Sequence, residues 1–402
     1  MSVVLYAIKD IITDYQSGAS DLAIQALQAL EELNDKYLSS SLHPDERWNQ
    51  LCAAGLALGT CRPAMGAAIL GVISQALVDV RSEWDRTGAR RKRDDGDDTY
   101  AQAFAGLALG SAVSAEYRLI PRITDQFIAY VRQLTAHTNP PTPLRILTLS
   151  SSSTLLQCLS SAILDHNTAP FDICILESRP GCEGAAFALS LLDMLEENPL
   201  FSHRATVTVA PDSHAALLAQ DVDLLLLGAD HIAPNGDVCN KTGSRVAASV
   251  ARAVRPDSRV VVVSQTSKIT NDHREPEEHD AEEVTRMWEG VDAEQLARYT
   301  ASGALRVKNV YFEYVPADLI DAYITGHGKL DVEDIQSIAE HRKKREEDLF
   351  SSSEVQEEAR RMIKREDWQS LIILYIGTVL ISLALSIRLP GYFPSYGFSS
   401  QE

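Results

Sequence analysis

Residues 228–243 of this 402-residue chain have the sequence GADHIAPNGDVCNKTG and directly follow the four leucines Leu224–Leu227. An unbroken apolar run of this kind is typical of a strand buried on both faces of a parallel sheet. Asp230 would then lie at the rim of the sheet, where partial desolvation can adjust a carboxyl group for proton transfer. Asn240 and Lys241 would open the next helix, where an amide and an ammonium can hold a sugar hydroxyl and a phosphate. A single Asp at a strand end is often only a structural cap, so the prediction of a site rests on the whole stretch.

The second half of the chain repeats this rhythm of short apolar runs. Most runs are separated by segments long enough for a helix, and this alternation predicts a parallel sheet covered on both faces. In such sheets, ligands bind just beyond the carboxyl ends of the strands. We therefore predict a Rossmann-like α/β domain over residues 144–330. Its strands are expected at Leu144–Leu149, Phe171–Leu176, Ala205–Val209, Val222–Leu227, Arg259–Val263 and Val307–Tyr314.

Two further strand ends carry groups that suit an anionic ligand. The first strand is followed by the hydroxyl-rich stretch Ser150–Thr154, whose backbone N–H groups can face an anion at a helix N-terminus. Serine and threonine are also ordinary helix caps, so capping alone explains this stretch equally simply. After the second strand, Arg179 lies in a Pro-Gly turn and can fork onto a phosphate or a carboxylate. The alternative for Arg179 is a solvated surface side chain.

Residues 1–138 have helical rather than strand-like periodicity. Their Ala- and Leu-rich stretches place apolar residues at helical spacing, which predicts an N-terminal helical domain. Residues 139–143, Asn-Pro-Pro-Thr-Pro, mark a domain boundary because proline interrupts both helices and strands. Beyond the α/β domain, residues 331–367 are polar and dense in both charges, which predicts an exposed, charged helical linker.

A hydrophobic tail follows at residues 368–388. The stretch Leu371–Ile387 has no charge, and as a helix it would be about 25 Å long, near the lower limit for spanning a bilayer. Four basic residues precede it and one follows, which would keep the bulk of the chain in the cytoplasm. The tail is therefore a candidate transmembrane helix of a cytoplasmic protein. The alternative is a buried helix or one that docks on a partner.

The composition excludes several classes of protein. Lys and Arg total 37 against 56 Asp and Glu, and the net charge of −19 excludes nucleic-acid binding through a broad basic face. The six cysteines contain no Cys-x-x-Cys pair, so they predict neither a zinc site nor a dense disulfide framework. We expect a reducing compartment, no metal and no cofactor.

Four segments of the chain resemble, in order, the motifs of one known family. These segments are Arg62–Met65, Glu177–Gly184, Gly228–Gly243 and Tyr314–Gly326. The family comprises the alpha, beta and delta regulatory subunits of eukaryotic translation initiation factor 2B, methylthioribose-1-phosphate isomerase and ribose-1,5-bisphosphate isomerase. The resemblance implies an N-terminal helical domain and a Rossmann-like parallel-sheet domain of the NagB/RpiA/CoA-transferase-like type. It also implies a homo-oligomer, or assembly with related initiation factor 2B subunits, and dimerisation through the α/β domain.

The resemblance also implies site residues. In the isomerases it points to a catalytic Asp, matched by Asp230, and to a catalytic Cys just after the first strand. Ser150 occupies that Cys position, and a hydroxyl, unlike a thiol, does not ionise near neutral pH without an activating base. The positions expected to bind substrate are Arg62, Arg179, Asn240 and Lys241.

Three interpretations of function follow. The catalytic Asp is retained as Asp230, but Ser150 replaces the catalytic thiol. This combination favours a protein similar to the regulatory subunits, with a sugar-phosphate pocket but no turnover. The alternative is a divergent aldose–ketose isomerase of the methylthioribose-1-phosphate or ribose-1,5-bisphosphate type, in which Asp230 works with another partner. A membrane-tethered scaffold that keeps only the fold is the third.

Overall fold

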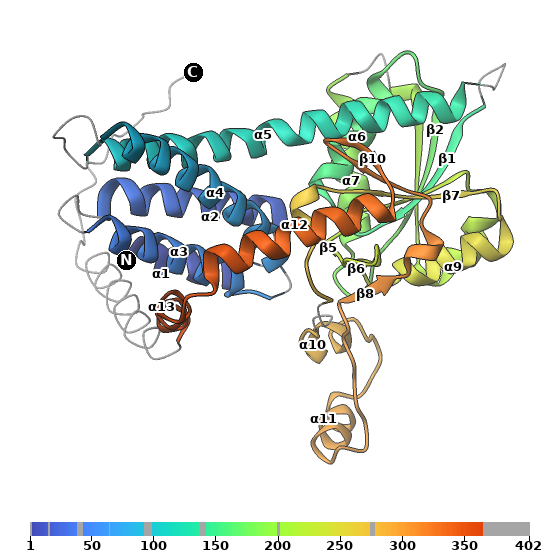
Figure 1. Ribbon diagram of the computed structural model, residues 1–402. Helices are drawn as coiled ribbons and strands as arrows, with labels where there is room; N and C mark the ends of the chain where they lie inside the picture. Colours follow the sequence, from blue (N-terminus) through green and yellow to red (C-terminus); the bar gives the residue numbers. More distant parts are fainter. Residues whose placement is uncertain are drawn as a thin grey trace, which may run out of the picture.

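The computed structural model describes residues 2–14, 17–37, 43–63, 65–91, 99–136, 142–198, 202–273 and 278–364. These residues form a helical lobe and an α/β lobe that share one long helix, α5 (Thr99–Thr135) (Figure 1). The first part of α5 belongs to the helical lobe. Its last turns pack on the sheet through Ile123, Phe127 and Val131, so one continuous helix connects the two lobes.

The helical lobe owes its compactness to closely packed Ala and Leu side chains. Gly59 allows two of its helices to approach closely, because a Cβ at this position would lie 2.6 Å from Leu70 Cδ1. The predicted N-terminal helices are therefore confirmed. Besides the first part of α5, the lobe contains α1 (Ser2–Thr13), α2 (Ala19–Glu32), α3 (Pro44–Thr60) and α4 (Gly66–Arg91).

The α/β lobe is built on a seven-stranded sheet with the strand order β10-β9-β7-β4-β1-β2-β3. Neighbouring strands are parallel, except that β10 runs antiparallel to β9. The predicted α/β class with a mostly parallel sheet is confirmed. The strands are β1 (Leu144–Leu149), β2 (Phe171–Leu176), β3 (Ala205–Ala210), β4 (Leu224–Leu227), β7 (Arg259–Val263), β9 (Ala322–Thr325) and β10 (Gly328–Leu330).

Helices cover both faces of this sheet. On one face, the end of α5 packs with α6 (Ser153–Leu164) and α7 (Glu183–Glu196). On the other face lie α8 (Ala215–Leu218), α9 (Ser244–Val254) and the start of α12 (Val332–Phe350). This double coverage explains why the central strand β4 is apolar throughout.

A second, smaller sheet is antiparallel and contains β5 (His231–Ile232), β6 (Val238–Lys241) and β8 (Phe312–Val315). It corrects two predictions. The strand expected at Val307–Tyr314 is shorter and pairs with β6 instead of joining the parallel sheet. The residues expected to open a helix, Asn240 and Lys241, are instead the end of β6, because they pair with β8, and α9 begins only at Ser244.

An arm that carries α10 (Ala281–Thr285) and α11 (Ala293–Ala301) projects from the small sheet, away from both lobes (Figure 1). It lies between β7 and β8 in the sequence, so it interrupts the chain just before the small sheet is completed.

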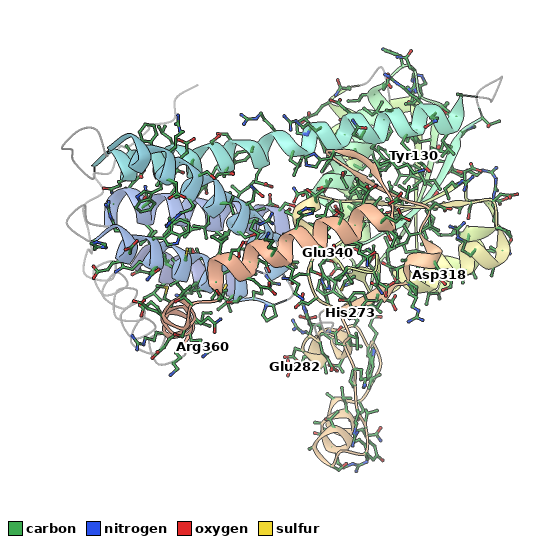
Figure 2. The ribbon with its side chains drawn as sticks, in the orientation of Figure 1. Tyr130, His273, Glu282, Asp318, Glu340 and Arg360 are labelled. Carbon is green, nitrogen blue, oxygen red and sulfur yellow. The ribbon has the colours of Figure 1, made fainter. Side chains whose placement is uncertain are left out.

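The charged segment after the sheet differs from the exposed linker that its composition predicts. It folds as α12 and α13 (Ser353–Ile363), and both helices bury one face against the rest of the protein. The buried apolar positions are Ile335, Ala339 and Phe350 of α12 and Val355, Ala359 and Met362 of α13. Charged side chains such as Glu340 and Arg360 remain exposed (Figure 2). An apolar stripe within a charged sequence thus makes these helices part of the fold.

The hydrophobic tail at residues 368–388 lies outside the described residues, and its membrane-spanning role stays a prediction. Within the part of the chain that the structure describes, no helix combines the length and apolar character needed to cross a membrane.

The buried guanidinium of Arg342 ties α12 to both lobes. Its Nη1 donates to the carbonyl oxygens of Ser267 at 2.8 Å and Ile269 at 2.7 Å, and its Nη2 donates to Ala67 O at 2.8 Å. Glu346 Oε1 accepts from Nε at 2.6 Å, so the charge is paired as well as hydrogen-bonded. One side chain therefore fixes the turn after β7 against the start of α4.

Replacing this guanidinium tests its structural role. We expect Arg342→Met to lower the free energy of unfolding by about 3–5 kcal/mol, because it removes the charge that pairs with Glu346 and the donor to three buried carbonyls. Urea denaturation measures the change. Lys343→Met, at an exposed neighbouring position, is the control and is expected to stay within about 0.5 kcal/mol of wild type. Equal effects of the two substitutions would contradict this account.

Candidate functional site

A cavity of about 310 Å³ lies at the carboxyl ends of β1 and β4, where the helical lobe meets the sheet. Predicted site residues Asp230, Ser150 and Asn240 all line it. The position agrees with the general rule that α/β sheets bind ligands beyond the carboxyl ends of their strands. The full lining is Ser17–Asp21, Met65, Leu149–Leu156, Glu183, Gly228–Asp230, Asn240, Lys268 and Tyr311–Phe312.

The turn between β1 and α6 forms one wall. Ser150 has a left-handed backbone with φ of 65°, an uncommon conformation for a residue other than glycine. Its N–H donates to Ser178 Oγ at 2.7 Å, which joins the ends of β1 and β2. Ser152 accepts from the N–H of Leu155 at 3.3 Å and so caps α6. The serine-rich stretch is thus a helix cap, as the simpler interpretation has it, and it also directs the N-terminus of α6 at the cavity.

The start of α2 forms the wall on the helical-lobe side. Ser20 Oγ donates to Gln265 Oε1 at 2.8 Å, a buried contact between α2 and the segment after β7. Ser17 to Asp21 therefore cover the cavity from above the strand ends. This cover comes from a part of the chain more than a hundred residues away from the sheet, and no local pattern indicated it.

Asp230 and Asn240 are placed by the hairpin of β5 and β6. The N–H of Asp230 donates to Cys239 O at 2.9 Å, so the turn after β4 is fixed against β6. Asn240 Nδ2 donates to Ser244 Oγ at 2.9 Å, and Asn240 Oδ1 lies on the side of Gly228, at the cavity. Burial raises the pKa of the Cys239 thiol, and the nearby Asp230 raises it further.

Lys268 is a lining residue that the sequence analysis did not single out. Its Nζ donates to Ala229 O at 2.7 Å. Burial lowers the pKa of this ammonium, while the charges of Asp230 and Asp21 act in the opposite direction. The sequence does contain a signal for Lys268. This residue follows the predicted strand Arg259–Val263, as Asp230 follows β4, so it lies at a strand end too.

Lys241 lies behind the cavity wall rather than in it. Its Nζ is 2.9 Å from Glu183 Oε1 and 3.2 Å from the centre of the Tyr311 ring. Tyr311 donates its hydroxyl hydrogen to the same Glu183 oxygen. Burial lowers the pKa of Lys241, and its bond to Glu183 opposes this shift. Of this cluster, Glu183 and Tyr311 belong to the lining of the cavity.

The two arginines expected to bind substrate point elsewhere. Arg62 is buried and donates to the backbone carbonyls of Ile11 and Asp14, so it fastens the end of α1. Arg179 forms an ion pair with Glu177 at 3.0 Å and lines a separate surface hollow. Neither belongs to the lining of the cavity.

The cavity offers no thiol from the described residues. Cys158 is buried in α6 with its Sγ 3.7 Å from Thr124 Oγ1, and burial raises its pKa to about 12. Cys158 therefore does not take the place of the cysteine of the isomerases at this cavity.

Comparison with known proteins places the chain in a family. The model of the initiation factor 2 subunit family matches residues 15–332. The chain belongs to this family. Ribose 1,5-bisphosphate isomerase of Haloterrigena turkmenica is 27% identical over 338 residues, which cover 80% of this chain and 88% of that protein. Methylthioribose-1-phosphate isomerase of Pelotomaculum thermopropionicum is 36% identical over 157 residues, 38% of this chain and 39% of that protein.

Solved structures of the family share the fold. Translation initiation factor eIF-2B of Pyrococcus horikoshii OT3 has a TM-score of 0.58 at 20% identity, over 83% of this chain and 98% of that one. The tetrameric eIF2B-beta2-delta2 complex of C. thermophilum gives 0.58 at 14% identity, over 85% and 93%. Members of the family therefore form oligomers. At these identities the likeness to this chain is one of fold alone.

Two glycines near the site respond differently to an added methyl group. A Cβ at Gly184 would lie 1.9 Å from Leu176 O, so Gly184→Ala has to displace backbone at the β2–α7 turn. We expect a loss of about 1–3 kcal/mol in unfolding free energy, measured by urea denaturation. Gly228→Ala is the control, because its Cβ would meet Ser152 and Asn240 at ordinary distances of 3.6–3.8 Å. Equal destabilisation by both substitutions would show that the tight approach at Gly184 does not matter.

Proposed function

We propose that the cavity binds a phosphorylated pentose and that the protein interconverts its aldose and ketose forms. The observation that carries the proposal is that Asp230, Asn240 and Lys268 line one cavity at the carboxyl ends of the strands. The identity to ribose 1,5-bisphosphate isomerase over most of both chains supports the same choice.

The proposed reaction of an aldose 1-phosphate is balanced within the sugar. One hydrogen moves from C2 to C1, the C2 hydroxyl loses a proton, the ring oxygen gains a proton as its bond to C1 breaks, and C2 becomes a ketone. These proton movements require a base and an acid. Asp230 is the base and the Lys268 ammonium is the acid, because its lowered pKa makes it a better proton donor than an exposed lysine. Lys268 thus supplies a second group in a cavity where Ser150 replaces the thiol.

A second function, ligand binding without turnover, is favoured by Ser150 itself. No histidine of the described chain lines the cavity, so the Ser150 hydroxyl lacks the usual activating base. In this alternative the protein resembles the regulatory subunits of initiation factor 2B and responds to a sugar phosphate without converting it.

Asp230→Asn separates these functions. If the protein is an isomerase, the wild type converts methylthioribose 1-phosphate or ribose 1,5-bisphosphate to the ketose, and the substitution lowers kcat by about 100-fold or more. Asp318→Asn, at an exposed carboxylate that does not line the cavity, is the matched control (Figure 2). Kinetics of ketose formation provide the measurement.

Each result has a clear meaning. Conversion that is lost in Asp230→Asn and kept in Asp318→Asn supports the isomerase. Tight binding by the wild type without conversion supports the regulatory alternative. Failure to bind either sugar phosphate contradicts both.

We also propose that the chain assembles with itself or with related initiation factor 2B subunits. Exposed apolar side chains gather on α7 and the edge strand β3, namely Leu189, Leu192 and Val209. Such a surface suits an interface through the α/β lobe. Sedimentation of the purified chain tests self-assembly: a monomer that takes up no related subunit would contradict this proposal.

A further inference from the structure

Lys268 is the only lysine in the described lining of the cavity, and both ends of its side chain are fixed. Arg342 Nη1 donates to the carbonyl oxygens of Ser267 at 2.8 Å and Ile269 at 2.7 Å, and these residues are the neighbours of Lys268 in the chain. At the other end, Lys268 Nζ donates to Ala229 O at 2.7 Å. The amine is therefore held at the turn that follows β4.

The surroundings of this amine differ from those of the other lysine nearby. Lys241 is paired with Glu183 at 2.9 Å and its side chain is only 2% exposed, whereas no ion pair in the described part of the chain includes Lys268. Burial lowers the pKa of Lys268, although the charges of Asp230 and Asp21 oppose the shift. A desolvated lysine with this property is the kind that forms Schiff bases with carbonyl compounds.

The proposed isomerisation would bring a carbonyl group to this amine. As Lys268 protonates the ring oxygen it becomes an uncharged amine, and Asp230 keeps the proton taken from the C2 hydroxyl. The sugar is then an open chain with a ketone at C2. In both candidate sugars C5 carries a substituent instead of a free hydroxyl, so this ketone cannot close into a five-membered ring. An uncharged amine and an open-chain ketone would thus lie in one cavity.

We propose that Lys268 forms a covalent imine with the C2 ketone of the open-chain ketose. Nζ adds to C2, one of its hydrogens passes to the ketone oxygen, and Asp230 donates a second proton, so that this oxygen leaves as water. An N=C bond forms as the C–O bond breaks, and no oxidant or reductant is consumed. The result is a protonated imine near the Asp230 carboxylate, and the opposite charges stabilise each other. The proposal rests on the proposed function, because the ketose is the product of that reaction.

Reductive trapping on the full-length chain tests the proposal. Sodium cyanoborohydride, added together with ribulose 1,5-bisphosphate, converts an imine into a stable amine, and peptide mapping by mass spectrometry locates it. We expect Lys268 to carry at least about ten times more adduct than Lys329, an exposed lysine outside the cavity that reports chance reaction at the surface. Lys241 should stay unmodified because it is buried and paired with Glu183.

Two arginine substitutions give a matched comparison. Lys268→Arg keeps a cation that can donate to Ala229 O, but a guanidinium does not condense with a ketone, so labelling should fall to the level of the surface lysines. Lys329→Arg makes the same change on β10, and it should leave the adduct at Lys268 undiminished.

The outcomes separate this proposal from the proposed function. If the wild-type protein binds ribulose 1,5-bisphosphate in calorimetry but Lys268 is labelled no more than Lys329, the imine is overturned and the isomerase is untouched. Labelling of Lys268 without conversion of the aldose supports the imine and contradicts the isomerase. Neither binding nor adduct overturns both. The mapping uses the wild-type chain, so the test does not depend on whether Lys268→Arg folds.

Discussion

The burial of β1 and β4 on both faces of the sheet is the constraint on which the rest of the structure depends. Leu224–Leu227 are fully covered, so β4 carries no polar side chain until it ends. β1 and β4 are neighbouring parallel strands, and their polar continuations therefore emerge at the same edge. Ser150 and Asp230 share one cavity for this reason, although eighty residues separate them in the sequence.

The carboxyl ends of the strands are open to water unless another part of the chain covers them. Here the helical lobe covers them. The contact of Ser20 with Gln265 places the start of α2 over the strand ends, and Arg342 fixes the segment after β7 against α4. Lys268 belongs to that same segment. The closure of the cavity and the placement of its ammonium thus have a common structural origin, which explains why the site requires both lobes.

The sequence predicted five of the seven strands of the large sheet, because apolar strands and the turns that follow them are local features, but it did not predict β9 and β10. Leu144–Leu149 and Phe171–Leu176 agree with the structure residue for residue, and Asp230 lies in the cavity as the strand-end argument implies. Asn240 also lines the cavity, but from β6 and not from the start of a helix. Contacts between distant segments were not predictable in this way. Arg62 and Arg179 have the right chemistry for phosphate, yet the first binds backbone carbonyls of α1 and the second pairs with Glu177. The cover from α2 and the pairing of Glu183 with Lys241 also depend on how remote elements pack.

Family membership fixes the fold more firmly than the chemistry, because the same scaffold carries isomerases and initiation factor subunits. The central claim is that a phosphorylated sugar binds between the two lobes at the ends of β1 and β4. A crystal structure of the full chain with methylthioribose 1-phosphate tests it most directly. The account predicts ligand density in this cavity, against Asp230, Asn240 and Lys268. An empty cavity at saturating ligand, or a ligand bound instead in the hollow beside Arg179, would contradict it.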